Sequence, residues 1–263
     1  MKITDIKNEW VSVVEEIDCG NLSFVESKKI YDLFLDRKIV IFKDQHLDDI
    51  QLKNFAELFG SVWNRDTETK MSGLDQTAEN NPTGYVELVS ESGILGNKYV
   101  PWHIDLTHFP SQVLPNRLLY AVELNGESAP TEFVYTLNCK EQLPKDVYEF
   151  LRNTNILCKA PYETPWKGYM RRPALNLHPV NNKYALMIDP CFTKWVDRLE
   201  EDVISYFKQL MEYINTEATY YAHEWELNDL VVYDNWSTIH QRREFNGSRK
   251  LKRVTWDQDW NRR

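Results

Sequence analysis

The N-terminal part of the chain alternates between helical and strand-like patterns of apolar residues. Residues 23–37 place apolar side chains on one helical face, and Ser23 can cap the start of that helix. A short apolar run at 38–45 is typical of a buried strand. Residues 47–60 repeat the helical pattern, with acidic residues in the first turn. The pattern predicts a helix–strand–helix unit over residues 23–60.

Beyond this unit, the apolar segments are mostly short. Five of them indicate strands, at 85–90, 117–124, 183–189, 229–235 and 248–260. Two longer segments, 144–154 and 199–215, have helical spacing. Many short strands with few helices favour a mainly β member of the α+β class, a β-sandwich or jelly roll with decorating helices. We expect a single domain over residues 1–263, with the unit at 23–60 packed on the jelly roll.

Two polar, turn-rich regions interrupt the pattern, at 64–98 and 159–176. Loops of this length in a compact domain are usually functional lids or disordered segments. The second region carries bulky and basic residues, namely Trp166, Tyr169, Arg171 and Arg172. It is either a surface loop or a mobile lid that supplies aromatic walls and a positive charge to a pocket.

Composition and charge narrow the function. The chain has 263 residues, of which 42% are hydrophobic and 27% charged, as in ordinary globular proteins. A net charge of -9 without a basic cluster argues against nucleic-acid binding. No apolar run approaches the roughly 20 residues that span a bilayer, and the N-terminus has no apolar signal region. The four cysteines are far apart, which indicates reduced thiols in a cytoplasmic protein.

The segment 100–108, VPWHIDLTH, contains the most informative pair of polar residues. In a strand, His103 and Asp105 would point to the same face. A facial Fe(II) site needs two histidines and one carboxylate, with other positions open. A single His-x-Asp pair arises easily by chance, so an ordinary strand with two polar residues stays open at this point.

A second histidine must come from elsewhere in the chain. His46 lies in a turn, His108 follows the pair too closely, and His223 could be a solvated loop residue. His178 precedes a proline, which suits a structural role better than ligation. His240 is delivered by a buried strand and a polar turn, and is therefore the strongest candidate.

Two arginines follow His240 at positions 249 and 253. Arg249 and Arg253 are four residues apart on a predicted strand and share a face. Arginine pairs bidentately with carboxylates and stays charged when buried, which favours an anion site. The alternative is a solvated basic edge beside Lys250 and Lys252.

Taken in order, these segments resemble the taurine-dioxygenase-like family (TauD/TfdA, clavaminate-synthase-like) of Fe(II)/2-oxoglutarate-dependent oxygenases. The resemblance covers nearly the whole chain. Its segments are RKIVIFKDQHLDDIQLKNFAELFG, WHIDLTH, RLLYAVEL, LHPV, DLVVYDNWSTIHQR and SRKLKRVTW. It implies a double-stranded β-helix, which is a jelly roll, with Fe(II) and 2-oxoglutarate as cofactors.

The resemblance also implies roles for individual residues. His103 and Asp105 match the family's His-x-Asp and His240 its distal histidine, so these three should bind iron. Arg249 matches the arginine that grips the far carboxylate of 2-oxoglutarate. Arg253 matches a position that contacts substrate or a 2-oxoglutarate carboxylate in some members.

One further 2-oxoglutarate contact is implied at Thr131. Family members often carry Gly-Gly-Asp-Thr where this chain has Ser-Ala-Pro-Thr at 128–131. The threonine is kept, but the glycines and the aspartate are missing.

The resemblance implies an oxygenase that hydroxylates an unactivated C–H bond of a small metabolite. Succinate and carbon dioxide are the co-products. The carboxylate of Asp105 argues against halogenation, because related halogenases carry a small residue there. Desaturation, ring formation or epimerisation at the same site stays open, and a non-catalytic jelly-roll binding protein is a remote alternative. The partners are substrate, 2-oxoglutarate and O2; we expect no nucleic acid and no membrane, and homo-oligomerisation is open.

Arg253 and the basic lid residues favour an anionic or zwitterionic substrate such as an amino acid, carboxylate or sulfonate.

Overall fold

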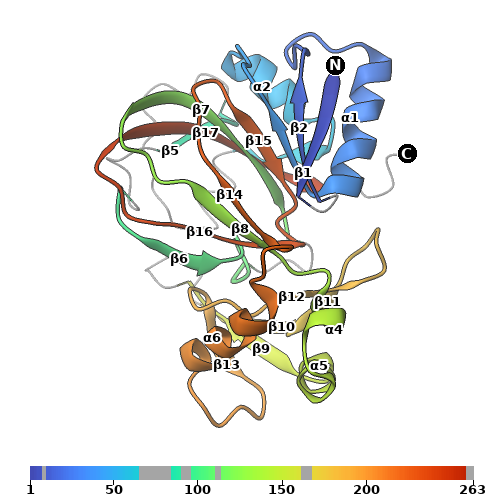
Figure 1. Cartoon of the computed structure of the whole chain (residues 1–263), viewed down its shortest axis with the longest axis vertical. Helices are drawn as coiled ribbons and strands as arrows, with labels where there is room; N and C mark the ends of the chain where they lie inside the picture. The colour runs from blue at the N-terminus through green and yellow to red at the C-terminus, as the bar shows by residue number, and fades with distance from the viewer. Residues whose placement is uncertain (8–9, 65–83, 90–95, 110–113, 161–167, 259–263) are drawn as a thin grey trace.

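Two β-sheets form the upper half of the molecule (Figure 1). The computed structural model describes residues 1–7, 10–64, 84–89, 96–109, 114–160 and 168–258. Within these ranges the larger sheet runs, in spatial order, through β1 (Lys2–Lys7), β2 (Val11–Glu15), β3 (Ile39–Phe42), β15 (Leu230–Tyr233), β7 (Asn116–Gly126), β17 (Gly247–Gln258) and β4 (Gly60–Val62). A further strand, β5 (Glu87–Val89), also pairs with β17. All neighbours are antiparallel except β2 and β3.

The smaller sheet is antiparallel throughout and packs against the larger one. Its order is β14 (Tyr220–His223), β8 (Thr131–Tyr135), β16 (Thr238–Arg242) and β6 (Val100–His103). Phe133 of β8 is fully buried in one apolar cluster with Ile41, Val231 and Leu251 of the larger sheet. Two sheets that enclose a common core confirm the predicted mainly β, jelly-roll class. The assignment of all 263 residues to one domain stays a prediction.

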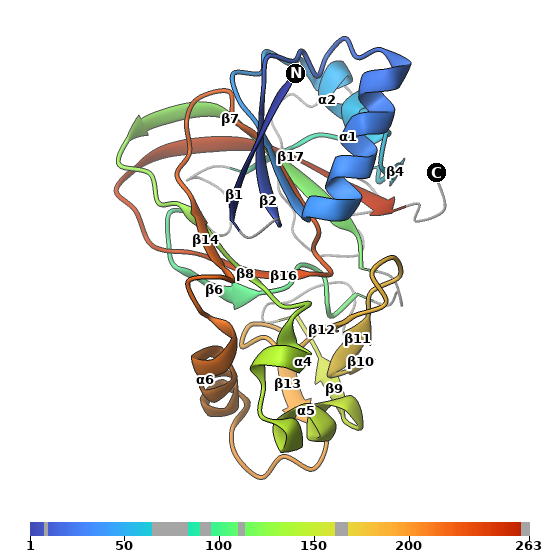
Figure 2. The same cartoon turned by 45° about the vertical axis from the view of Figure 1, so that its right-hand side comes forward.

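The N-terminal helices cover the outer face of the larger sheet (Figure 2). Helix α1 (Phe24–Arg37) begins at a capping box formed by Ser23 and Glu26, and α2 (Asp49–Ala56) begins at one formed by Asp48 and Gln51. Phe34 of α1 and Phe59 pack on Trp256 of β17, and Phe55 of α2 packs on Phe59. The predicted helix–strand–helix unit at 23–60 is therefore confirmed, and aromatic burial fixes it to the sheet.

A third region lies below the sheets, and its apolar core also includes Val134 and Ile239 of the smaller sheet (Figures 1 and 2). It contains the three-stranded sheet β10 (Met170–Pro173), β9 (Asn155–Cys158) and β13 (Thr193–Val196), and the pair β11 (Leu175–Leu177) and β12 (Tyr184–Leu186). The helices are α4 (Cys139–Gln142), α5 (Lys145–Arg152) and α6 (Val203–Ile214). The predicted helices at 144–154 and 199–215 are confirmed, whereas the three-stranded sheet was not predicted.

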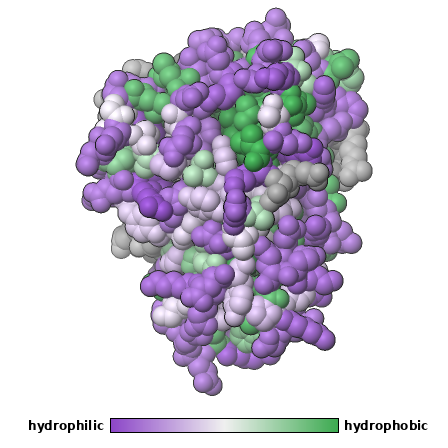
Figure 3. Space-filling view, viewed as in Figure 1, coloured by the Kyte–Doolittle hydropathy of each residue, from purple (hydrophilic) through white to green (hydrophobic). Residues whose placement is uncertain are grey.

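The surface seen from the side of Figure 1 is mostly hydrophilic, with an apolar area in its upper half where β1 and β2 run (Figure 3). Among the described residues, no helix has both the length and the apolar character needed to cross a bilayer.

Candidate metal centre and active site

Two histidines face each other across the smaller sheet. His103 ends β6, and His240 lies in the middle of β16. The ladder pairs the two residues directly, and their ring centroids are 4.1 Å apart. Because directly opposed residues in a ladder present their side chains on one face, strand pairing alone brings the two imidazoles together.

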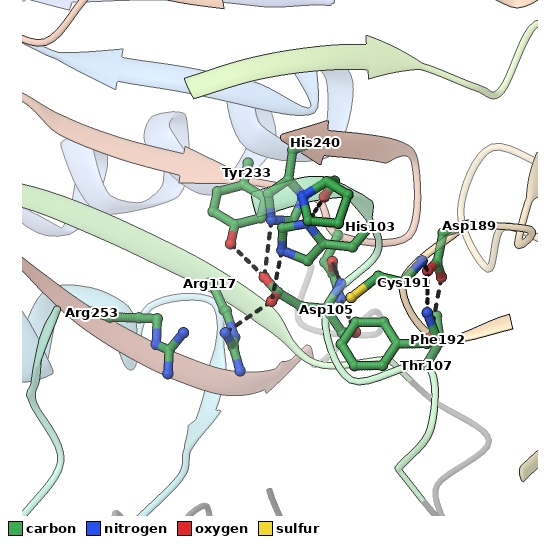
Figure 4. Close-up of polar contacts among 12 residues, drawn as sticks. His103, Asp105, Thr107, Arg117, Asp189, Cys191, Phe192, Tyr233, His240 and Arg253 are labelled. Atoms are coloured by element: carbon green, nitrogen blue, oxygen red, sulfur yellow. Dashed lines mark hydrogen bonds and ion pairs between the residues drawn. The ribbon is translucent and has the colours of Figure 1, made fainter. Parts of the chain in front are cut away.

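Asp105 reaches the same point from a turn beyond β6 (Figure 4). Asn235 holds the backbone of this turn: its Nδ2 donates to the Asp105 carbonyl, and its Oδ1 accepts from the Asp105 N–H, both at 2.9 Å. The strand ends at His103, and Leu106 has a positive φ of 59°. The expectation that His103 and Asp105 share one strand face is therefore wrong, because a turn and not the pleat places the carboxylate beside the imidazoles.

The spacing of the three groups suits a single divalent metal ion. The His103 Nε2 is 3.7 Å from the Asp105 Oδ1, and the His240 Nε2 is 3.4 Å from the Oδ2. One ligand atom from each residue lies within 4.8 Å of the other two. Ligands at right angles and ~2.1 Å from a metal would be ~3 Å apart, so only a small contraction is needed. Two imidazoles and one carboxylate are the donor set of non-haem Fe(II) oxygenases.

The protonation of the site favours metal binding. The His103 Nδ1 hydrogen-bonds to the Pro101 carbonyl at 2.8 Å, which leaves the Nε2 lone pair free. Burial, helped by the neighbouring His240, lowers the pKa of His103 to about 3. Burial alone would raise the pKa of Asp105, but Arg117 and His240 hold it well below its usual range. Near neutral pH, His103 is therefore neutral and Asp105 is ionised.

Two side chains that the sequence analysis did not single out bind the carboxylate of Asp105 (Figure 4). The Arg117 Nη1 donates to Oδ1 at 3.0 Å, and the Tyr233 hydroxyl donates to Oδ2 at 2.7 Å. Arg117 and Tyr233 are ladder partners on β7 and β15, and both are buried. The sequence did contain a signal for Arg117, which begins the apolar run at 117–124. An arginine that is buried with such a run usually has an anionic partner.

Arg249 is buried on β17. Its Nη1 donates to the Ala129 carbonyl at 3.0 Å, and its guanidinium lies over the Phe245 ring. Among the described residues, no carboxylate lies within ion-pair distance of it. Burial, followed by repulsion from Arg242, lowers the pKa of Arg249 to about 9. The alternative of a solvated basic edge is therefore wrong at Arg249, and the geometry fits an anion-binding arginine.

Thr131 begins β8, two residues after Ala129, and its side chain is buried. Its hydroxyl oxygen accepts a hydrogen bond from the Trp225 Nε1 at 3.0 Å. That bond leaves the hydroxyl proton available for another acceptor.

Arg253 lies on the same buried face of β17 as Arg249 but is bound to an acid. Its Nε donates to Glu87 Oε2 at 2.8 Å, and its Nη2 binds the same oxygen. Glu87 opens β5, which pairs with β17 opposite Arg253. The shared face was predicted correctly, whereas the ion pair was not foreseen.

Comparison with known proteins decides the family. The family model described as "Taurine catabolism dioxygenase TauD, TfdA family" matches residues 2–255. The chain belongs to this family. The TauD/TfdA enzymes are Fe(II)/2-oxoglutarate-dependent dioxygenases, so the predicted enzyme class and both predicted cofactors are confirmed.

Relatives in the TauD/TfdA family differ in what they act on. An alkylsulfatase of Acinetobacter baylyi is 25% identical, over 88% of this chain and 74% of its own length. An alpha-ketoglutarate-dependent 2,4-dichlorophenoxyacetate dioxygenase of a Burkholderia species is 23% identical, over 90% and 87%. The crystal structure of AAD-2 in complex with Mn(II) and N-oxalylglycine has a TM-score of 0.81 at 19% identity and covers 98% of both chains. This likeness shows that the two chains share a fold.

His178 is not part of the candidate metal site in this TauD/TfdA fold. It is buried, and its Nε2 lies 2.8 Å from the Asp234 Oδ2. The Lys38 Nζ lies 4.0 Å from the same oxygen. These contacts agree with the predicted structural role of His178.

The remaining histidines also lie outside the triad. His223 was expected in a solvated loop, but it is buried in β14 with its Nε2 3.2 Å from the Asp229 Oδ2. His108 is fully buried and stacks on Phe192. The exposed His46 lies before α2, as predicted.

The two predicted lid regions are only partly visible. Residues 65–83, 90–95 and 161–167, which include Trp166, lie outside the described residues. Tyr169 and Arg171 are exposed.

The expectation that residues 159–176 form a surface loop or a mobile lid is wrong at Arg172. It is 1% exposed in β10 and donates to the carbonyls of Thr107 and Phe109, at 2.6 and 2.9 Å. Arg172 therefore anchors the chain after the metal motif and does not belong to a mobile loop.

Proposed function

We propose that His103, Asp105 and His240 are the protein ligands of Fe(II), and that the enzyme hydroxylates a C–H bond of a small anionic or zwitterionic metabolite. The observation that carries this proposal is the convergence of two imidazoles and one ionised carboxylate at a buried point. Bound Fe(II) would supply the chemistry that activates O2, one oxygen atom of which enters the substrate as its new hydroxyl and the other the succinate formed, with carbon dioxide, from 2-oxoglutarate. The protein's part is to orient the reactants and to exclude water from them.

Arg249 and Thr131 form the proposed site for the far carboxylate of 2-oxoglutarate. Arg249 contributes a buried charge, and Thr131 contributes a hydroxyl proton that Trp225 does not use. An incoming carboxylate would give this arginine its missing counter-charge, which supports affinity for a dianionic cosubstrate.

Within the predicted substrate class, the Glu87–Arg253 pair favours a zwitterionic substrate over a simple anion. A simple anion at Arg253 must share the guanidinium with Glu87. An amino acid avoids this competition, because its carboxylate can bind the arginine while its ammonium approaches the glutamate. The 2,4-dichlorophenoxyacetate dioxygenase is named for a carboxylate, and this supports an anionic group on the substrate.

The metal assignment is tested by anaerobic titration with Fe(II) or Mn(II). Wild type should bind one ion, and His103→Ala, Asp105→Ala and His240→Ala should each lose it, since a facial site retains little affinity with two ligands. His46→Ala is the matched control and should bind like wild type, because His46 is exposed. Full metal occupancy in His240→Ala would show that the distal ligand is another residue.

The substrate class is tested by substrate-stimulated succinate release across amino acids, carboxylates and sulfonates. Wild type should respond best to an amino acid. Glu87→Gln frees Arg253 from its acidic partner, and should shift the preference toward simple carboxylates and sulfonates. A preference for neutral compounds in both proteins would contradict the proposed substrate class.

A further inference from the structure

We propose that Arg117 is the counter-ion of Asp105 in the metal-free enzyme and that it shares this carboxylate with the metal once the metal binds. The inference rests on the proposed role of Asp105 as a ligand and goes beyond it. It makes Arg117 a charge-balancing residue that sets how tightly the site holds its metal.

The contact between the two residues is direct and buried. The Arg117 Nη1 lies 3.0 Å from the Asp105 Oδ1, and the side chains are 3% and 12% exposed. The same oxygen faces the His103 Nε2 at 3.7 Å. A metal bound between the imidazoles and the carboxylate would therefore approach an oxygen that the guanidinium already holds (Figure 4).

The enzyme must fold before it has a metal, and the site then contains a buried carboxylate. A buried anion without a partner is strongly destabilising, and a guanidinium offsets that penalty. Arg117 thus stabilises the empty site. Once the metal arrives, its charge adds to that of the guanidinium, and the two cations repel each other across one carboxylate.

The orientation of Asp105 does not depend on Arg117. Asn235 binds its backbone N–H and carbonyl, and the Tyr233 hydroxyl binds Oδ2 at 2.7 Å. Removing the guanidinium therefore removes a positive charge while these three bonds still aim the carboxylate. This decides the sign of the effect: without Arg117, metal affinity should rise and metal-free stability should fall.

The test compares thermal unfolding of wild type and Arg117→Met at pH 8, with and without saturating Mn(II), and Mn(II) affinity by electron paramagnetic resonance. The metal-free variant should melt about 5–10 °C below wild type. Mn(II) should restore most of that loss, and the variant should bind it about tenfold more tightly. Arg117→Lys keeps a cation and should resemble wild type in both measurements.

Arg172→Met is the matched control. Arg172 is equally buried and close to the metal motif, but it donates to the Thr107 and Phe109 carbonyls and not to a carboxylate. Its replacement should lower the melting temperature by the same amount with and without Mn(II) and leave the Mn(II) affinity unchanged.

The inference is overturned, while the metal site stands, if Arg117→Met lowers the melting temperature equally with and without Mn(II). Weaker Mn(II) binding by this variant would also overturn it. If wild type does not bind Mn(II) and its melting temperature does not change with Mn(II), both the metal site and this inference are overturned. If Arg117→Met does not fold in either condition, Arg117→Gln is measured in the same way, since glutamine keeps a hydrogen bond to Asp105 and loses the charge. Tighter Mn(II) binding by that variant supports the inference, and unchanged or weaker binding overturns it.

Discussion

Replacing Arg249 by methionine should stabilise the ligand-free enzyme and, at the same time, remove most of its affinity for 2-oxoglutarate. Arg249 is 5% exposed and has no acidic partner among the described residues. Its contacts are one carbonyl, that of Ala129, and the ring of Phe245. A buried charge without a counter-charge lowers the stability of the fold until a ligand of opposite charge binds.

The size of the gain follows from the lowered pKa of Arg249, about 9. With ~1.4 kcal/mol for each tenfold change, burial and Arg242 together destabilise the charged form by ~4–5 kcal/mol. The bond to Ala129 returns ~1.5–3 kcal/mol and the Phe245 ring ~0.5–1 kcal/mol. Methionine fills the apolar part of the space, so the variant should gain ~1–2 kcal/mol, or about 2–8 °C in melting temperature.

The assay combines urea unfolding of the ligand-free proteins with calorimetric titration of 2-oxoglutarate into the Mn(II) form. Arg249→Met should bind 2-oxoglutarate about 30-fold to several thousandfold more weakly, since losing one partner of a buried charge pair costs about 2–5 kcal/mol. Arg253→Met is the control from the same face of β17. It should destabilise the protein by about 3–5 kcal/mol, because Glu87 loses its guanidinium, and should change 2-oxoglutarate binding little.

A ligand-free Arg249→Met protein that is less stable than wild type would refute this reasoning, because it would show that the guanidinium is already balanced within the fold. Equal losses of 2-oxoglutarate affinity in the Arg249 and Arg253 variants would refute the assignment of the cosubstrate to Arg249.

Two further predictions concern a structural pair and a hydroxyl group. Burial raises the pKa of Asp234, but His178 and Lys38 outweigh burial and lower this pKa to about 2. The ionised carboxylate therefore stabilises the fold above pH ~4, and this stabilisation is lost as the pH falls through 2. Asp234→Asn should therefore lose ~2–3 kcal/mol of unfolding free energy at pH 7, and a urea series at falling pH that shows an unchanged difference would contradict this. Thr131→Val should weaken 2-oxoglutarate binding about 10- to 100-fold in the same calorimetric titration, whereas Thr131→Ser should keep it; equal losses would mean that the hydroxyl is not the contact.

Local signals in the sequence were enough to predict the N-terminal unit. Ser23 and Glu26 have the spacing of a capping box, and the structure forms both of its hydrogen bonds. The apolar stripe of this helix buries Ile30 and Phe34, as its period requires. Caps and periods act within a few residues, so one sequence shows them without knowledge of the fold.

The site was predictable in its residue types but not in its charge balance. His103, Asp105 and His240 follow from donor chemistry and motif order, although the turn at Asp105 was mistaken for a strand. Neither Arg117 nor Glu87 could be paired in advance. Glu87 lies 166 residues from its partner Arg253, and register between distant strands, which sequence pattern does not specify, creates such contacts.

Three of the buried arginines, Arg117, Arg249 and Arg253, can be distinguished by what neutralises each one. Arg253 is bound to a glutamate that belongs to the fold, so its charge is balanced whether or not a ligand is present. Arg117 is bound to a carboxylate that is also placed to receive a metal, so its balance changes with metal loading. Among the described residues, Arg249 contacts a carbonyl and a ring, and an anion from outside the protein is the counter-charge that fits it. The different partners of Arg253, Arg117 and Arg249 support the proposed roles of these arginines at the substrate, the metal and the cosubstrate, respectively.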